Sequence, residues 1–186
     1  MKNPYLYGYL PLITILLFSM TFGIFVVTES LTLFKAIGVY SGMREFLSDI
    51  EIRVLLLIIV SLIFFMLFSA LKLIGETIHE IGLLFFLKNS GEMVSNTRGG
   101  YVIFFFGAVA SVFGIQSIIV LILVFLLTTI CYFIYVIYKL SFSMSTGGMI
   151  GMIFFEILVW VILCALILYA VLKLYNGILA SLPFAN

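Results

Sequence analysis

Long uninterrupted stretches of hydrophobic residues dominate this 186-residue chain, and short polar segments separate them. The hydrocarbon core of a bilayer is about 30 Å thick, which a helix of roughly 20 apolar residues can cross. Three of the stretches have about this length and are nearly free of charge. They predict membrane-spanning helices over residues 10–28, 54–74 and 149–172.

A further stretch, from Tyr101 to Tyr138, carries no charged residue at all. One continuous helix of that length would rise about 57 Å, nearly twice the hydrocarbon thickness, whereas two full spans joined by a turn would need more residues. We therefore predict a single long span over 107–138, tilted or bent, with one end of the stretch in the interface.

The segment between the first two spans, residues 28–53, has a different pattern. Its apolar residues recur at spacings of three and four, with charged residues between them. The apolar positions are Phe34, Ile37, Met43, Phe46, Leu47 and Ile50. This pattern predicts an amphipathic helix, broken near Gly38 or Gly42, that lies on the membrane or packs over the span ends.

The pattern as a whole predicts an all-α integral membrane protein with four transmembrane helices and an amphipathic interfacial segment between the first two. We expect one membrane domain over 1–186, with residues 88–100 as its water-exposed polar linker. With the N-terminus inside, five basic residues lie on the inner side and four on the outer side, which favours this orientation only weakly. Acidic residues count for little in this comparison.

Composition agrees with the pattern and excludes several functions. Hydrophobic residues make up 65% of the chain and charged residues 9%, against about 25% charged in soluble domains. A net charge of +1 lacks the basic footprint of a nucleic-acid-binding protein. Cys131 and Cys164 lie inside apolar runs, which favours free thiols over a disulfide. No metal-finger spacing, phosphate loop or nucleophile elbow is present, so we expect no cofactor.

The sequence "ETIHE" contains the chain's single histidine, His79, between Glu76 and Glu80. On a helix these three side chains share one face, and Glu-x-x-His is also a metal-ligand spacing in di-iron bundles. Such a site needs a second copy of the motif, which this chain lacks. These residues are weak metal candidates, and the plainer interpretation is a water-facing helix end at which His79 is solvated or contacts lipid headgroups.

Glu156 interrupts the last apolar stretch about 10 Å from its start. An ionised carboxylate in hydrocarbon costs several kcal/mol, so it should face protein or water. Its role is either a hydrogen bond between helices, a proton- or cation-linked function, or a solvated position near the interface. Thr128 and Thr129 would lie at a similar depth on an antiparallel neighbour and are its candidate partners. Gln116 is another polar candidate within a span.

Small residues form two seams that allow helices to approach closely. Gly107, Ser111 and Gly114 share the first, and Gly147 and Gly151 form a GxxxG pair. Packing within one chain and self-association are both consistent with these seams.

Three stretches carry a resemblance to a known family: "NPYLYGYLPLITILLFS" at the start, "FMLFSALKLI" at 65–74 and "LKLYNGILASLPF" near the end. Together they resemble YufK-like proteins, which are small uncharacterised integral membrane proteins of Gram-positive bacteria. The resemblance implies a multi-pass protein of the bacterial plasma membrane with four spans, and it implies no activity.

Three functions follow as hypotheses. The first is a non-enzymatic membrane protein that acts through the lipid bilayer, a partner membrane protein or a second copy of itself. The second is a small proton- or cation-coupled transporter that uses Glu156. The third is a membrane-surface metalloenzyme at Glu76, His79 and Glu80.

Overall fold

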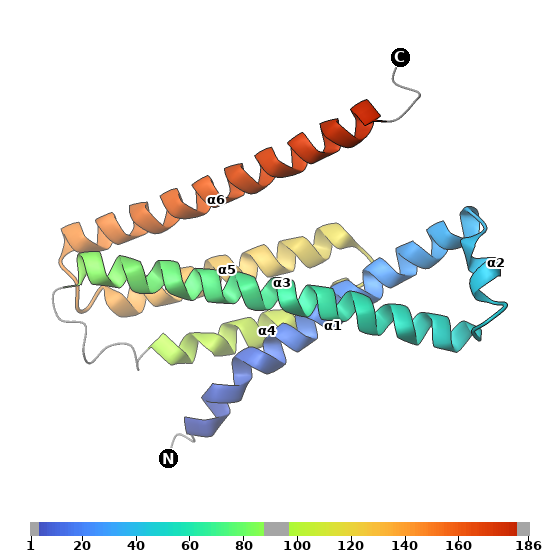
Figure 1. The fold of residues 1–186 in the computed structure, drawn as a ribbon. Helices are drawn as coiled ribbons and strands as arrows, with labels where there is room; N and C mark the ends of the chain where they lie inside the picture. The colour runs from blue at the N-terminus through green and yellow to red at the C-terminus, as the bar shows by residue number, and fades with distance from the viewer. Residues whose placement is uncertain (1–3, 88–96, 182–186) are drawn as a thin grey trace. The chain divides into compact units, whose positions relative to one another are not determined.

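The computed structural model describes residues 4–87 and 97–181, which are helical with short turns and contain no strand (Figure 1). The helices in chain order are α1 (Pro4–Ala36), α2 (Val39–Met43), α3 (Asp49–Phe86), η1 (Thr97–Gly100), α4 (Tyr101–Ser111), η2 (Val112–Gly114), α5 (Ile118–Leu140) and α6 (Thr146–Ser181). The predicted polar linker, 88–100, falls mostly outside the described residues, and its last four form η1.

Within the described residues, α1, α3, α5 and α6 are long and apolar enough to cross a membrane. The predicted fold class, an all-α protein with four membrane-spanning helices, is thereby confirmed.

Three of these helices extend well past the predicted spans of 10–28, 54–74 and 149–172. Hydropathy marks where lipid can lie, whereas a helix ends where its backbone groups find other partners. Ser48 and Glu51 provide such a boundary, because the Glu51 carboxylate accepts the Ser48 N–H at 2.8 Å and the Ser48 hydroxyl accepts the Glu51 N–H at 3.3 Å. This reciprocal capping box begins α3 five residues before its apolar stretch.

The stretch predicted as one long span over 107–138 contains one helix long enough to cross, α5, but the span does not begin at 107 and is not continuous. The stretch forms two helices, α4 and α5, with η2 and a turn between them. They pack antiparallel, since a side-chain carbon added at Gly100 would meet the ring of Tyr132 and one added at Gly114 would meet Val120. Helix α4 has 11 residues and rises about 16 Å, half the hydrocarbon thickness. Gln116 is exposed in the turn rather than inside a span.

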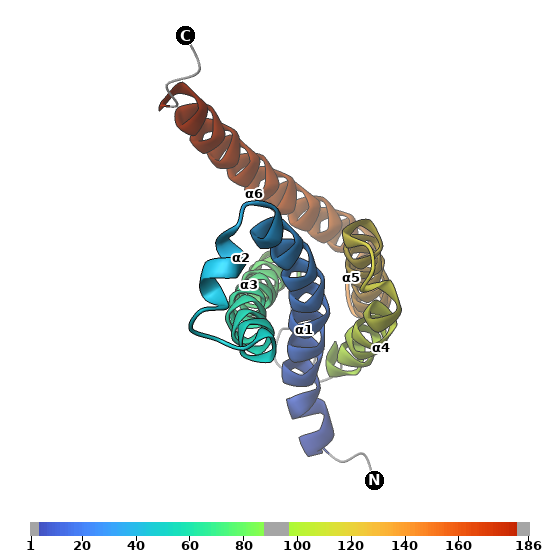
Figure 2. The same ribbon diagram turned by 90° about the vertical axis from the view of Figure 1, so that its right-hand side faces the viewer.

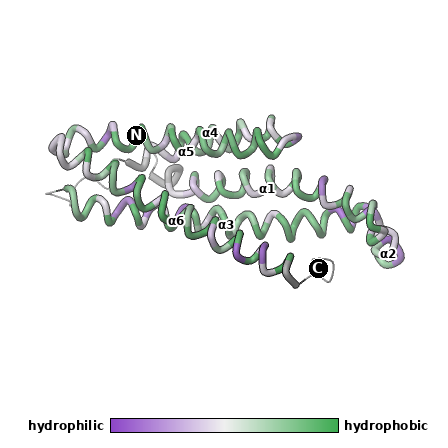
Figure 3. Tube along the Cα trace, turned by 90° about the horizontal axis from the view of Figure 1, so that it is seen from above, coloured by the Kyte–Doolittle hydropathy of each residue, from purple (hydrophilic) through white to green (hydrophobic). Residues whose placement is uncertain are grey.

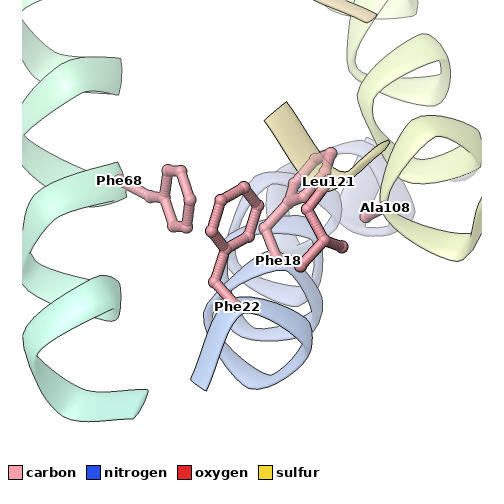
Figure 4. Packing of buried hydrophobic residues seen from close by; sticks show 5 residues of the cluster. All are labelled: Phe18, Phe22, Phe68, Ala108 and Leu121. Atoms are coloured by element: carbon pink, nitrogen blue, oxygen red, sulfur yellow. The ribbon is translucent and has the colours of Figure 1, made fainter. Parts of the chain in front are cut away.

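The described residues divide into two compact units, one built from residues 4–75 and 97–139 and the other from 76–87 and 140–181. In the first unit, α1 lies between α3 and the α4–α5 hairpin (Figure 2). Figure 4 shows its core, in which Phe18 and Phe22 of α1 face Phe68 of α3, with Ala108 of α4 and Leu121 of α5 beside them.

A polar contact accompanies this apolar core. The hydroxyls of Thr21 on α1 and Ser111 on α4 are 3.0 Å apart and both side chains are buried. The Thr21 hydroxyl also lies 3.0 Å from the Phe18 carbonyl oxygen and the Ser111 hydroxyl 2.6 Å from that of Ala108, so one hydroxyl can donate to its own helix while the other donates across the contact. The helix contact therefore leaves neither hydroxyl unpartnered in an apolar setting.

The amphipathic segment predicted over 28–53 packs over the ends of α1 and α3. The helix breaks at Gly38, whose φ of 80° suits glycine, so that α2 can fold back. Apolar side chains of the segment, including Tyr40, Met43 and Leu47, cover a small cluster formed by Val27, Leu31 and Ile52. Figure 3 shows hydrophilic positions gathered around α2, whereas the spans are predominantly hydrophobic.

In the second unit the end of α3 packs antiparallel to the start of α6, and the two run side by side in Figure 1. Gly82 faces Met152 and Phe155, and Phe86 lies against Gly151. These small residues let the helices approach closely and place α3 residues 76–86 opposite the first third of α6.

Candidate functional site

His79 on α3 and Glu156 on α6 form a hydrogen-bonded pair within the second unit. The His79 Nδ1 and the Glu156 Oε1 are 2.7 Å apart. The two residues are 77 positions apart in the sequence, so the pair is a tertiary contact between antiparallel helices. The prediction that His79 is solvated or touches lipid headgroups is therefore wrong.

The pair is shielded from solvent. The Glu156 side chain is 8% exposed and that of His79 is 22% exposed. The second ring nitrogen of His79, Nε2, is also buried and has no hydrogen-bond partner within the described part of the chain. A buried polar atom without a partner costs free energy, which makes Nε2 a feature that calls for an explanation.

Aromatic and small residues on both helices hold the pair in place. Phe155, the residue before Glu156, packs against the rings of Phe85 and Phe86. A carbon added at Gly151 would lie 2.5 Å from the Phe86 ring. The contact of Phe86 with Gly151 and that of Gly82 with Phe155 fix the register of the helices, and this register sets His79 opposite Glu156.

The other acidic residues of the motif take different positions. Glu76 is half-buried and Glu80 is exposed on α3. Within residues 4–87 and 97–181, no group of three or more His, Cys, Asp or Glu side chains gathers into a metal-binding arrangement. The metal ligand set of Glu76, His79 and Glu80 is accordingly not formed by this structure.

Thr128 and Thr129, the candidate partners of Glu156, donate their hydroxyls to carbonyls of their own helix. The acceptors are Val124 at 2.7 Å and Phe125 at 2.9 Å. The carboxylate instead bonds to the imidazole. Hydroxyls within a helix readily satisfy themselves in this way, so a shared depth does not make them partners of a carboxylate.

The small-residue seams are used unequally. Gly107 packs directly against Thr128, and Ser111 and Gly114 are buried. Of the GxxxG pair, Gly151 contacts Phe86, whereas Gly147 has open space around it in the structure as described. Gly148 makes the close helix contact that was expected of Gly147. A carbon added at Gly148 would lie 3.0 Å from the Phe86 carbonyl oxygen.

The part of α6 that follows the pair is uncharged over about one crossing. Between Glu156 and Lys173 the helix carries no charge, and the distance between them is about 26 Å along the axis, close to the hydrocarbon thickness of about 30 Å. Packing against protein atoms leaves the Glu156 side chain 8% exposed.

The contact joins a hydrogen-bond donor to an acceptor. A neutral imidazole that donates from Nδ1 to the carboxylate keeps an acceptor lone pair on Nε2. This nitrogen is buried and has no partner in the described part of the chain.

The fold and this site define the chain as a multi-pass helical membrane protein. Residues 27–183 match the Family of unknown function (DUF5366). The chain belongs to that family.

One relative extends the similarity over nearly the whole chain. The "Uncharacterized membrane protein YufK" of Bacillus subtilis (strain 168) is 38% identical over 184 residues, which cover 98% of this chain and all of the relative. The resemblance seen in the sequence is thereby confirmed, and with it a bacterial membrane protein as the class. No solved structure matches the chain.

Proposed function

We propose that this chain is a non-enzymatic membrane protein that acts through contacts with membrane partners, and that the His79–Glu156 bond is a proton-sensitive lock on the α3–α6 pair. The observation that carries this proposal is the 2.7 Å bond between a buried carboxylate and the chain's single histidine. Histidine is the side chain whose ordinary charge change falls between pH 5 and 8. The bond therefore joins the two helices through a side chain of this type.

The remainder of α6 supports action through partners. From Val161 to Leu179, nearly every residue of the helix is exposed, and most are apolar. Such a surface is suited to lipid or to another membrane helix. Release of the lock would change how this surface is presented, since the bond fixes α6 to α3 near one end of the helix.

Other titratable groups near the lock are few. Glu76 and Glu80 flank His79 on α3, and α6 has no other charged residue between Thr146 and Lys173. Glu80→Gln is the matched control, because Glu80 is exposed on the same helix and adjacent to His79 in sequence.

Electron paramagnetic resonance distances test the lock directly. Spin labels would be placed at Leu84→Cys and Phe154→Cys, which are 74% and 67% exposed, after replacement of Cys131 and Cys164 by serine. In bicelles the distance distribution should be narrower at pH 5 than at pH 8, and reversibly so, because a protonated imidazole bonds the carboxylate as an ion pair. In His79→Gln and Glu156→Gln this pH dependence should be lost, and in Glu80→Gln it should remain. The same distribution at both pH values in the parent protein would refute the lock.

A second candidate function is a small proton- or cation-coupled transporter. A proton path usually needs more than one ionisable group within the membrane. His79 provides the second group, 2.7 Å from Glu156. Reconstituted protein should then dissipate a pH gradient in liposomes, and Glu156→Gln should abolish the flux while the protein remains folded. No flux from the parent protein would reject transport without affecting the lock.

A further inference from the structure

A layer of tyrosine rings joins two lysines at one end of the first unit. The Lys72 Nζ lies 5.8 Å from the centroid of the Tyr101 ring, and the Lys139 Nζ lies 5.9 Å from that of Tyr135. Tyr101 stacks on Tyr132 at 6.4 Å between centroids. Each of the two ammonium groups, from α3 and α5, thus lies over a tyrosine ring.

Two glycines complete this layer. A carbon added at Gly100 would lie 2.6 Å from the Tyr132 ring and 3.2 Å from that of Tyr135, and one added at Gly99 would lie 2.8 Å from the Tyr135 hydroxyl oxygen. The rings of α5 therefore pack directly on the backbone that leads into α4. We call this assembly of Lys72, Lys139, Tyr101, Tyr132 and Tyr135 the lysine–tyrosine cluster.

The cluster differs from the other lysine–tyrosine contacts of the chain. Lys35 lies over Tyr40 and Lys173 over Tyr169, each with a single ring and each exposed. Lys72 and Lys139 are half-buried. Partial burial of a cation strengthens its interaction with an anion, because water screens the charges less.

The first unit carries its described carboxylates at one end, where Lys35, Arg44 and Arg53 also lie. Its described carboxylates are Glu29, Glu45, Asp49 and Glu51. Asp49 and Glu51 lie in the first turn of α3, at least 21 residues before Lys72. Glu29 lies near the end of α1, and Glu45 follows α2 at the same end of the unit. Glu76, four residues after Lys72, is the next carboxylate along α3.

The position of the cluster fits the headgroup zone of a bilayer. Lys139 is in the last turn of α5, a helix whose 23 residues rise about 34 Å. This length matches one crossing, so Lys139 lies at a membrane boundary, and tyrosine and lysine favour that level. We propose that the lysine–tyrosine cluster binds the phosphate headgroup of an anionic phospholipid. This inference is independent of the proton-sensitive lock.

Native mass spectrometry in a neutral detergent tests the proposal with two defined lipids, dioleoylphosphatidylglycerol and dioleoylphosphatidylcholine. The parent protein should bind the anionic lipid preferentially. Each of Lys72→Gln and Lys139→Gln should weaken that binding by about fivefold, and the double variant by about twenty-fold, since a basic residue near an anionic surface contributes about that factor. Lys173→Gln is the matched control and should bind as the parent does.

Two further measurements complete the test. Replacement of both cluster lysines by arginine retains the charges and should restore preferential binding if a glutamine variant is poorly folded. Inorganic phosphate added in excess should not displace the lipid, because the acyl chains contribute to its binding. Equal binding of the two lipids by the parent, equal losses in Lys173→Gln, or displacement by inorganic phosphate would each overturn the assignment.

Discussion

The most informative perturbation is a double-mutant cycle on the bond between His79 and Glu156. Replacement of either residue by alanine removes one partner of a 2.7 Å hydrogen bond and leaves the other polar group in a packed interior. Removal of both leaves neither group unpartnered. The pair should therefore show coupling, with the double variant losing less stability than the sum of the two single variants.

The magnitude follows from the geometry. Hydrogen bonds to charged groups contribute about 1.5–3 kcal/mol net in soluble proteins, and bonds between membrane helices average about 0.6 with a maximum near 1.7 kcal/mol. Glu156 is well buried and His79 partly exposed, so a coupling of about 1–2 kcal/mol is expected. Each single variant should lose about 2–3 kcal/mol, because the remaining partner stays desolvated.

Steric trapping in bicelles at neutral pH measures the free energy of unfolding of the parent protein, the two single variants and the double variant. Glu80→Ala, on the exposed side of the same helix, should change the free energy of unfolding by less than about 0.5 kcal/mol. Additivity of the two single changes, within about 0.3–0.5 kcal/mol, would show that the bond contributes nothing to stability and would refute the reasoning.

Two pairs of glycine variants test the packing and the turn. Gly107→Ala places a carbon 2.5 Å from a Thr128 methyl and should lower the free energy of unfolding by about 1–3 kcal/mol, whereas Gly147→Ala enters open space and should change it by less than about 0.5 kcal/mol. Gly38→Ala, at a φ of +80°, should cost about 1–2 kcal/mol, and Gly42→Ala in α2 should be neutral or stabilising by up to about 1 kcal/mol. Thermal unfolding in detergent measures all four, and an equal effect within either pair would contradict the structure.

The sequence allowed the four membrane helices to be predicted, because apolar length and lack of charge are local properties that lipid requires. The α4–α5 hairpin could not be obtained in the same way. Helix α4 is as apolar as a span but is too short to cross, and its residues Ala108 and Ser111 are buried within the protein. Hydropathy does not distinguish contact with lipid from contact with protein, so it does not reveal a chain reversal at residues 115–117.

The His79–Glu156 bond was missed for a related reason. Both residues were singled out as unusual, but the partner of Glu156 was sought on the third apolar stretch, at Thr128 and Thr129. Which helices pack together is a tertiary property that periodicity does not encode. One signal was available: the chain's only histidine lies about two turns before the end of α3, and the only carboxylate of the last apolar stretch lies about three turns after the start of α6.

The single histidine of the chain also makes the central claim directly measurable. Protein labelled with ¹⁵N-histidine, purified without a histidine tag, gives imidazole signals from His79 alone. In lipid bilayers, solid-state NMR should show an Nδ1 proton hydrogen-bonded to a carboxylate, and the signals and their pH dependence should change in Glu156→Gln but not in Glu80→Gln. Identical spectra of the parent protein and Glu156→Gln across pH 5–8 would contradict the account.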